Sequence, residues 1–298
     1  MKKITKAVIP AAGLGTRFFP ATKTIPKEML PIVDKPTMLY VIEEAVQAGI
    51  EDIILIQGRG KTAIEDFFDI SYELEDKLVK DGKQHLIDEI NKIRNSVNII
   101  SIRQKSPLGL GHAVKCAHIV TGDDPFAVLL GDEITISNSP DKNITKFLTQ
   151  KSMETGHSSV WVLPVAQEET HKYGIVDIKD KTSTDLSKGK KVFGVVEKPK
   201  SAVAPSLWAL PGRYVFTSEI MKKLEEIPPG HNGEFQLSDA MNRLAESSVL
   251  NAYSFNGRRF DAGDKLGFLL ANIEVALDRE DLRAGVMDFI RSKLKDNL

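Results

Sequence analysis

Strand-like and helix-like segments alternate through about the first 160 residues, and this alternation limits the folds open to the chain. Apolar runs typical of strands cover Lys6 to Pro10, Asp52 to Gln57, Val97 to Arg103, Phe126 to Leu130 and Ser159 to Pro164. Helical patterns separate several of them, at Thr37 to Ala48, Leu110 to Val120 and Ile144 to Glu154. The alternation predicts an α/β fold with a mainly parallel sheet and helices on both faces.

The later part of the chain is denser in strands. Two helical patterns, near Lys265 to Leu277 and Arg279 to Leu294, end the sequence. No linker rich in Pro, Gly or Ser divides the chain, so we expect one domain over residues 1–298 with elaborations. The further strands are expected at Gly174 to Ile178, Val192 to Glu197, Trp208 to Phe216 and Asn251 to Phe255.

Composition excludes several classes of protein. The net charge of −1 provides no overall basic field, so we expect no nucleic-acid partner. No apolar run approaches the roughly 18 residues that a membrane span requires, so we expect no membrane association. The single cysteine, Cys116, cannot form an internal disulfide and is expected in the core-facing side of a helix. We expect a cytoplasmic protein.

The segment Ala11 to Pro31 follows the first strand and combines glycines, cations and prolines. A dinucleotide-binding fingerprint is one interpretation, but Phe18 stands where its third glycine is needed. Pro20 and Pro26 would also interrupt the helix that this fingerprint opens. A dehydrogenase-type site is therefore disfavoured.

A P-loop at Gly60-Lys61-Thr62 is the second interpretation, since it lies between a strand and a helical pattern. The first glycine of that motif would stand at Leu55, inside the strand, which leaves the loop too short to cradle phosphates. We expect Lys61 to be an exposed residue at a helix start.

The third interpretation is a nucleoside triphosphate loop of another kind. Glycine lets backbone N–H groups approach phosphate oxygens closely, and Arg17 and Lys27 add positive charge. The prolines keep the segment extended, so that it can wrap a polyphosphate. The density of cations and prolines favours this interpretation over a simple structural turn.

This segment also resembles a known family. G-x-G-T-R followed by P-K-x-x-x-P, in "GLGTRFFPATKTIPKEMLPIVDKP", is similar to the signature of sugar-1-phosphate nucleotidylyltransferases. The likeness extends over roughly residues 5–275 through "RQKSPLGLGHAVKCA", "VVEKPK", "GRYVF", "EFQLSDA" and "FDAGDKLG". "PATKTIPKEMLP" and "GLGHAV" point to the uridylyl group within the family.

The resemblance implies a fold, a cofactor and an assembly. It implies a Rossmann-like mixed sheet with a nucleotide-binding part over about residues 1–135 and a sugar-binding and C-terminal part over about 136–298. It also implies dependence on Mg²⁺ and a homo-oligomer, often a tetramer.

The implied reaction transfers UMP from UTP to glucose 1-phosphate and yields UDP-glucose and pyrophosphate. The sugar phosphate is already an anionic nucleophile, so alignment and charge neutralisation suffice, without a base or covalent intermediate. This chemistry agrees with the lack of any Ser-His-Asp constellation or Cys/His metal cluster in the sequence.

By resemblance, the N-terminal loop holds the nucleotide. Ala11, Ala12 and Gly13 resemble the turn that lines the nucleoside. Arg17 and Lys27 match positions that hold the triphosphate and the departing pyrophosphate, and both are expected to be catalytic.

Further positions resemble the base-reading and sugar-binding residues. Gln104 and Gly109 match uracil-reading positions, because a carboxamide can pair with both a donor and an acceptor. Gly174 resembles a glycine whose backbone approaches the glucose ring. Glu197 is expected to accept hydrogen bonds from sugar hydroxyls, and Lys198 to hold the sugar phosphate as a catalytic residue; without the resemblance, the two form a surface ion pair worth little.

Two aspartates match the metal positions of the family. Asp132 follows a central apolar strand, where open α/β sheets bind ligands, and is expected to be both catalytic and a metal ligand. We expect its neighbour Glu133 to point away, because side chains alternate along a strand. Asp261 is preferred over Asp264 as the second ligand, and two carboxylates with phosphate oxygens suit Mg²⁺.

Two other functions stay open. A relative that uses another base or sugar, such as a thymidylyltransferase, shares most of these motifs. A non-catalytic nucleotide-sugar sensor should have lost Arg17, Lys27, Asp132 or Lys198, and all four are present. His112, at a helix start, is given no catalytic role and is expected to be structural or solvent-facing.

Overall fold

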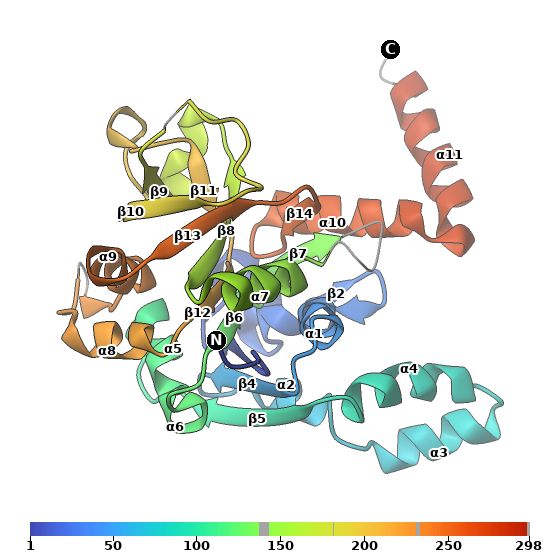
Figure 1. The fold of residues 1–298 in the computed structure, drawn as a ribbon. Helices are drawn as coiled ribbons and strands as arrows, with labels where there is room; N and C mark the ends of the chain where they lie inside the picture. Colours follow the sequence, from blue (N-terminus) through green and yellow to red (C-terminus); the bar gives the residue numbers. More distant parts are fainter. Residues whose placement is uncertain (137–142, 181, 231–232, 297–298) are drawn as a thin grey trace.

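The computed structural model describes residues 1–136, 143–180, 182–230 and 233–296. A ten-stranded sheet forms its centre (Figure 1). The strands lie in the order β11 (Trp208–Leu210), β9 (Gly174–Ile178), β10 (Lys190–Glu197), β13 (Leu250–Ser254), β8 (Ser158–Pro164), β12 (Arg213–Phe216), β6 (Phe126–Leu129), β1 (Lys6–Ala11), β4 (Asp52–Gln57) and β5 (Asn98–Arg103).

Parallel pairing is concentrated in the N-terminal part of the sheet. β1 pairs in parallel with β4 and β6, and β4 pairs in parallel with β5. Among the later strands only β8 and β13 pair in parallel, while β9, β10, β11 and β12 make antiparallel pairs. The predicted α/β class with a mixed sheet is confirmed. The expectation that the sheet is mainly parallel is wrong, because antiparallel pairs outnumber the parallel ones among the described strands. The parallel part lies mostly where strands and helices alternate in the sequence.

Helices cover both faces of the sheet, and the alternation of side chains explains why. Along β1, Ala7 and Ile9 are buried in the cluster beneath α1 (Thr37–Gln47) and α7 (Ile144–Thr155). Val8, between them, is buried in the opposite cluster, with α5 (Leu110–Cys116), α8 (Glu219–Glu226) and α9 (Leu237–Ser247). Strands with both faces buried read as continuous apolar runs, as observed here.

The expected strand from Trp208 to Phe216 is wrong in one respect, because the chain forms two strands there. The break falls at Pro211 and Gly212. Proline cannot donate to a ladder, and Gly212 adopts φ 114°, which favours glycine. The turn lets β12 pair with β6 while β11 pairs with β9.

The remaining elements surround this core. β2 (Pro31–Ile32) pairs with β3 (Lys35–Pro36), and β7 (Glu133–Ile136) pairs with β14 (Arg258–Asp261). α3 (Tyr72–Lys80) and α4 (Gln84–Arg94) stand off beyond β5, and α11 (Glu280–Asp296) rises from the end of α10 (Lys265–Asp278) (Figure 1). The short elements are α2 (Thr62–Asp66), α6 (His118–Thr121), η4 (Gln167–Lys172) and η5 (Ser201–Val203).

The two terminal helices agree with the pattern predicted from the sequence. Within the described residues, no helix is long and apolar enough to cross a membrane.

Candidate active site

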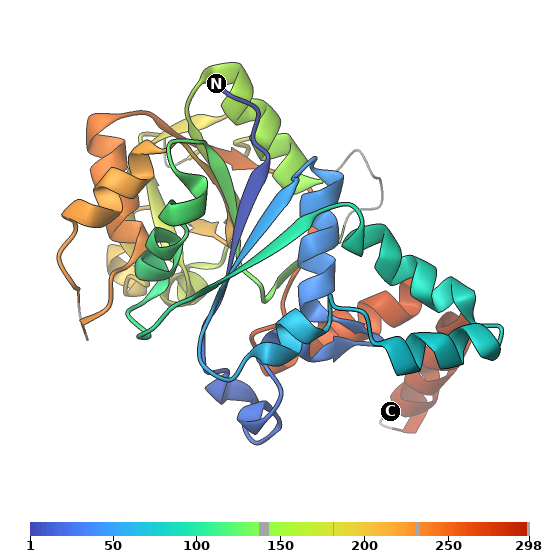
Figure 2. The same cartoon turned by 90° about the horizontal axis from the view of Figure 1, so that it is seen from below.

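The segment after β1 does not enter an α-helix. It forms three short 3₁₀ turns, η1 (Thr16–Phe18), η2 (Ala21–Lys23) and η3 (Lys27–Met29), before α1 begins at Thr37. Figure 2 shows this segment, in dark blue, standing beyond the end of β1. The missing α-helix excludes a dinucleotide fingerprint. The expectation of an extended loop is wrong, because the segment coils into these three turns. Gly15 adopts φ 66° in its first turn, where a side chain would be strained.

A hollow of about 320 Å³ lies beside this loop. It gathers residues from the N-terminal loop, the β6–β7 turn, β9, β10 and the end of β14. Six of the predicted site residues line it: Arg17, Asp132, Gly174, Glu197, Lys198 and Asp261. These positions come from distant parts of the sequence, and the fold brings them to one place.

The two predicted metal-binding aspartates face each other across Gly263. A Cβ atom built on Gly263 would lie 2.5 Å from Asp132 Oδ2 and 3.0 Å from Asp261 Oδ1. Burial, and then the neighbouring carboxylate of Asp132, raise the pKa of Asp261. A cation between the carboxylates would relieve this repulsion, and only glycine leaves room beside them. The donor set therefore fits a hard divalent cation.

The two carboxylates do not form a complete metal site alone. Among the described residues, no group of three or more His, Cys, Asp or Glu side chains could hold a metal ion. That the remaining ligands come from nucleotide phosphates stays a prediction.

Lys27 pairs directly with Asp132. Its Nζ lies 2.5 Å from Asp132 Oδ2. Burial opposes the charged form of both groups, but their attraction outweighs it, so the pKa of Asp132 is lowered and that of Lys27 is raised. Arg17 Nη1 donates to the carbonyl oxygen of Gly263 at 3.3 Å. Arg17 and Lys27 of the loop thus lie beside the aspartate pair.

The structure distinguishes the aspartates from their neighbours. Glu133 lines the same hollow, so the expectation that it points away is wrong. Asp132 lies in the turn before β7, outside the regular alternation of a strand. Arg259 donates two hydrogen bonds to the Glu133 carboxylate, and its Nε lies 2.6 Å from Oε2. Asp264 instead caps α10, accepting from backbone N–H groups at 3.1 and 3.2 Å.

A buried arginine supports the turn that carries Asp132, and the sequence analysis did not identify it. Arg213 is 1% exposed and pairs with Glu44, with Nη2 2.8 Å from Oε2. The guanidinium also donates to the carbonyl oxygens of Leu130 at 3.3 Å and Glu133 at 2.6 Å, on either side of Asp132. The sequence signal that could have identified this residue is a charged arginine at the start of an otherwise apolar strand.

Lys61 is buried, so the expectation of an exposed residue at a helix start is wrong. It is 7% exposed and its Nζ lies 2.8 Å from Oε2 of Glu28, which is 1% exposed. Burial raises the pKa of Glu28 and lowers that of Lys61. Because Glu28 directly follows Lys27, the pair anchors the loop after β1 to the segment after β4.

The predicted sugar-binding residues meet on adjacent strands. Gly174 pairs with Glu197 in the β9–β10 ladder, and a Cβ atom on Gly174 would lie 3.3 Å from Glu197 Oε2. Lys198 adopts a left-handed φ of 45°, and its N–H donates to the carbonyl oxygen of Tyr173 at 3.0 Å. Its Nζ is 3.9 Å from the Glu197 carboxylate, a loose contact that leaves the ammonium free to bind an anion.

The predicted base-reading residues lie beside this hollow and do not line it. Gln104 is 6% exposed, which excludes a surface glutamine. Gly109 adopts φ 93°, and a Cβ atom there would lie 2.8 Å from the carbonyl oxygen of Phe235. Phe235 exchanges backbone hydrogen bonds of 2.8 Å with Leu108 and Gly111, so the loop has a fixed position.

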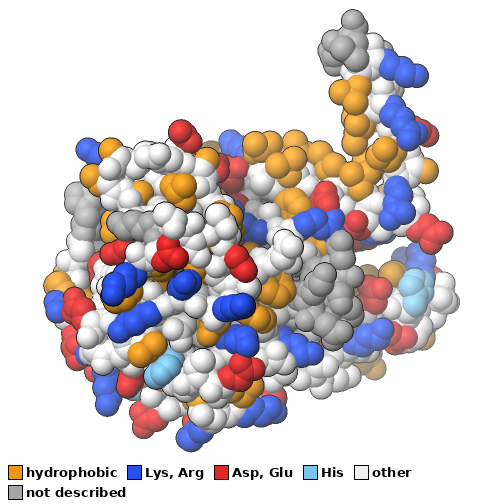
Figure 3. All heavy atoms as spheres, turned by 45° about the horizontal axis from the view of Figure 1, so that its top comes forward, with side chains coloured by type: hydrophobic (Ala, Val, Ile, Leu, Met, Phe, Trp, Pro, Cys, Tyr) orange, Lys and Arg blue, Asp and Glu red, His pale blue; other side chains and the backbone are white. Residues whose placement is uncertain are grey.

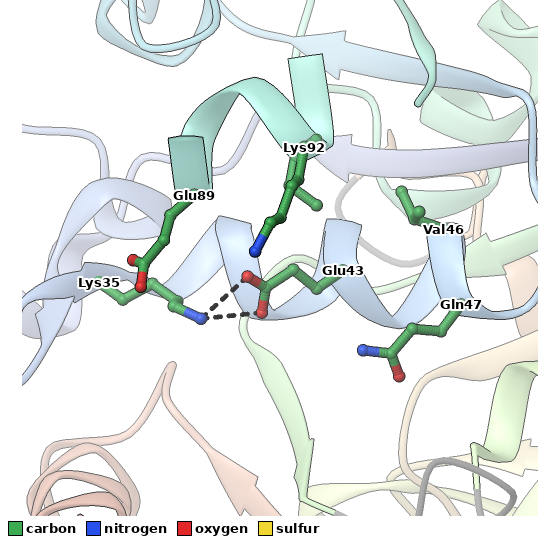
Figure 4. A pocket seen from close by; sticks show the side chains of 7 residues that line it. Lys35, Glu43, Val46, Gln47, Glu89 and Lys92 are labelled. Carbon is green, nitrogen blue, oxygen red and sulfur yellow. Dashed lines mark hydrogen bonds and ion pairs between the residues drawn. The ribbon is translucent and has the colours of Figure 1, made fainter. Parts of the chain in front are cut away.

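A second hollow, of about 290 Å³, lies between α1 and α4 (Figure 4). Lys35 in this hollow donates to both carboxylate oxygens of Glu43, at 2.9 and 3.0 Å. None of the predicted site residues lines this hollow. We do not assign it a role in the reaction.

The fold and the constellation around the aspartate pair define a nucleotidyl transferase. The Nucleotidyl transferase family model matches residues 6–276, and the chain belongs to this family. The chain is 50% identical over 294 residues to the UTP–glucose-1-phosphate uridylyltransferase of Bacillus subtilis (strain 168), which covers 99% of this chain and 98% of that protein.

Solved structures support the same family assignment. A UTP-bound UGPase from Acinetobacter baumannii superposes with a TM-score of 0.88 at 41% identity, covering 96% of this chain and 98% of that one. A UDP-glucose pyrophosphorylase complexed with UDP-glucose superposes with a TM-score of 0.84 at 39% identity, covering 93% and 100%.

Proposed function

We propose that this protein transfers UMP from UTP to glucose 1-phosphate, releasing pyrophosphate and forming UDP-glucose. The observation that carries the proposal is the joining of three sets of groups in one hollow: the cationic loop after β1, the Asp132–Asp261 pair and the strand-end pair Glu197 and Lys198. The likeness to uridylyltransferases over the whole chain supports the choice of UTP.

In this mechanism the chain's own residues align two anions. Lys198 holds the phosphate of glucose 1-phosphate, while Glu197 and the backbone at Gly174 bind the sugar. Arg17 and Lys27 bind the triphosphate and stabilise the charge that grows on the departing pyrophosphate. Attack at the α-phosphorus, in line with the leaving group, then requires no general base.

Asp132 and Asp261 are the residues that would hold Mg²⁺. When bound, the cation would neutralise phosphate charge that the two lysines and Arg17 do not cover. Lys27 pairs with Asp132, which places its ammonium group beside the carboxylate that would hold the cation.

Pyrophosphate release tests the proposal. Purified protein is incubated with glucose 1-phosphate, Mg²⁺ and each of UTP, dTTP, CTP, ATP and GTP. UTP should give the highest kcat/KM and dTTP should be second. Comparable turnover with ATP or GTP would overturn the assignment of the base. Failure with glucose 1-phosphate but turnover with another sugar phosphate would overturn the assignment of the sugar.

We also propose that the protein is a homo-oligomer. Apolar side chains form an exposed stripe over α10 and α11, visible in Figure 3. Its members are Leu266, Leu269, Leu270, Phe289 and Leu294. An apolar stripe along two projecting helices is typical of a surface covered in an assembly. Light scattering after size-exclusion chromatography should give a mass above the 33.0 kDa of one chain.

Two further parts of the proposal concern organisation and location. We propose a single domain, because the ten-stranded sheet takes strands from both sides of residue 135. A cytoplasmic location suits a protein whose proposed substrates are charged nucleotides and sugar phosphates.

A further inference from the structure

His112 is a polar residue that the proposed mechanism does not use. It lies in the first turn of α5, three residues after Gly109, and is half-buried. Its ring packs near Phe235, with ring centroids 6.3 Å apart. Its Nδ1 lies 2.9 Å from Gln104 Nε2, the amide of the predicted base-reading residue.

The orientation of the Gln104 carboxamide follows from its surroundings. The carbonyl oxygen of Gly109 lies 3.2 Å from the Gln104 amide, and a carbonyl oxygen can only accept. The atom facing it must therefore be the nitrogen, Nε2. This nitrogen has two hydrogens, and the second is directed at His112 Nδ1.

The histidine tautomer follows in turn. Nδ1 accepts from Gln104, so the ring proton resides on Nε2. Burial, with a smaller effect of Lys115, lowers the pKa of His112, which keeps the ring neutral at pH 7. The other polar atom near Nδ1 is Cys116 Sγ at 3.9 Å, a weak donor that is compatible with an accepting nitrogen.

These two contacts occupy both N–H groups of Gln104. None of the described residues donates a hydrogen bond to its oxygen, Oε1. With Gln104 reading the base, as the resemblance implies, its carboxamide presents only an acceptor to that base. Uracil carries an imide N–H that such an acceptor can bind, whereas cytosine presents an unprotonated ring nitrogen at the same position and would meet the oxygen with its own lone pair.

We propose that His112 is a positioning residue that locks the Gln104 carboxamide with its oxygen toward the base, and thereby sets the discrimination of UTP from CTP. The inference rests on the proposed function, since it deepens the account of how the base is chosen. His112 acts through Gln104 and does not itself contact the nucleotide.

The test compares two substitutions with a matched control. His112→Phe keeps an aromatic ring against Phe235 but removes the acceptor, whereas His112→Asn keeps an acceptor one atom beyond Cγ. Cys116→Ser changes the neighbouring contact on the same helix. For each protein kcat/KM is measured for UTP and for CTP, with high enzyme concentrations for the poor substrate and Mg²⁺ and glucose 1-phosphate present.

His112→Phe should reduce the ratio of kcat/KM for UTP over CTP by about 5-fold or more, the equivalent of one lost hydrogen bond. The effect should appear as a higher KM for UTP, with the KM for glucose 1-phosphate unchanged. His112→Asn should retain most of the wild-type ratio, and Cys116→Ser should retain all of it.

Two results would overturn the inference: an unchanged ratio in His112→Phe, which includes an equal loss toward both nucleotides, or the same loss of ratio in Cys116→Ser. If His112→Phe does not fold, ¹⁵N NMR of the wild-type protein can instead determine which nitrogen of the His112 ring carries the proton. A proton on Nε2 supports the lock, and a proton on Nδ1 refutes it. A wild-type protein that does not turn over UTP would instead refute the proposed function, a result distinct from all of these.

Discussion

Arg213 and Glu44, 169 positions apart in the sequence, form a buried ion pair that holds the turn carrying Asp132. Every N–H of the guanidinium has an acceptor: the Glu44 carboxylate and the carbonyl oxygens of Leu130, Gly212 and Glu133. Glu44 in turn accepts from two threonine hydroxyls, at 2.7 and 2.5 Å. A fully satisfied network of this kind fixes backbone position, and here that backbone positions a predicted catalytic carboxylate.

Removing the arginine should therefore affect both stability and activity. Arg213→Met leaves the Glu44 carboxylate buried without its cation, so the free energy of unfolding should fall by about 3–5 kcal/mol. The double variant Arg213→Met/Glu44→Met should recover much of that loss, because no unpaired charge is left. Urea denaturation followed by circular dichroism measures the free energy of unfolding of both variants. A single variant as stable as the wild type would contradict the structural role.

The Glu28–Lys61 pair predicts a pH-dependent effect. Burial already raises the pKa of Glu28, and Lys61 opposes that rise. In Lys61→Met the opposition is gone, so the folded-state pKa should rise further above the unfolded value. The folded state then binds more protons than the unfolded state between these two pKa values, and stability falls as pH increases through this window.

Lys61→Met should thus lose more stability at pH 8 than at pH 5, relative to the wild type at each pH. At pH 8 we expect a loss of about 3–5 kcal/mol, measured by urea denaturation. Lys61→Met/Glu28→Gln is the matched control, and it should not show the larger loss at pH 8 that the single variant shows. A pH-independent loss in the single variant would show that Glu28 is not the group responsible.

The aspartate pair predicts dependence on a divalent cation. Asp132→Asn and Asp261→Asn should each nearly abolish pyrophosphate release while retaining the wild-type circular dichroism spectrum. EDTA should abolish pyrophosphate release by the wild-type protein, and added Mg²⁺ should restore it. Full activity in EDTA, or in either variant, would be incompatible with a metal held by these carboxylates.

Gly263 provides an independent test of the same site. In Gly263→Ala the new methyl group would lie 2.5 Å from Asp132 Oδ2, so the carboxylates must move apart. We expect a higher Mg²⁺ concentration for half-maximal activity. Gly285→Ala, in α11, is the control, because a Cβ atom there meets nothing within 4 Å. Equal Mg²⁺ requirements in both variants would argue against a cation beside Gly263.

Lys27 and Lys198 should give different kinetic signatures. Lys27→Ala should mainly lower kcat, because charge grows on the departing pyrophosphate in the transition state. Lys198→Ala should mainly raise KM for glucose 1-phosphate, because that contact is present in the bound ground state. A charge-assisted hydrogen bond corresponds to an effect of roughly 10- to 150-fold in each case.

Lys200→Ala is the matched control for Lys198→Ala, since Lys200 is exposed and lies outside the hollow. It should change neither parameter by more than about two-fold. Steady-state kinetics with each substrate varied distinguishes the signatures. The division of roles fails if both lysine variants show the same change, or if neither differs from the control.

Local sequence information was sufficient to predict the parallel part of the sheet and the absence of an α-helix in the first loop. Alternating and helical periodicities reflect which face of each element is buried, so they can be recognised without knowing what covers that face. The prolines and glycines between Gly13 and Pro31 restrict the backbone directly, so the absence of an α-helix there could be predicted. Asp132 and Asp261 were selected by resemblance, and the structure brings them together beside Gly263.

The tertiary structure alone decided which polar groups are buried and what they pair with. Lys61 has the local sequence of an exposed helix start, yet folding buries it against Glu28. Glu133 lines the hollow together with Asp132, which lies in the turn before β7, and Arg259 donates hydrogen bonds to the Glu133 carboxylate. The orientation of Gln104 depends on the Gly109 carbonyl and on His112 together. Burial and hydrogen-bond partners depend on segments distant in sequence, and no local pattern encodes where those segments meet.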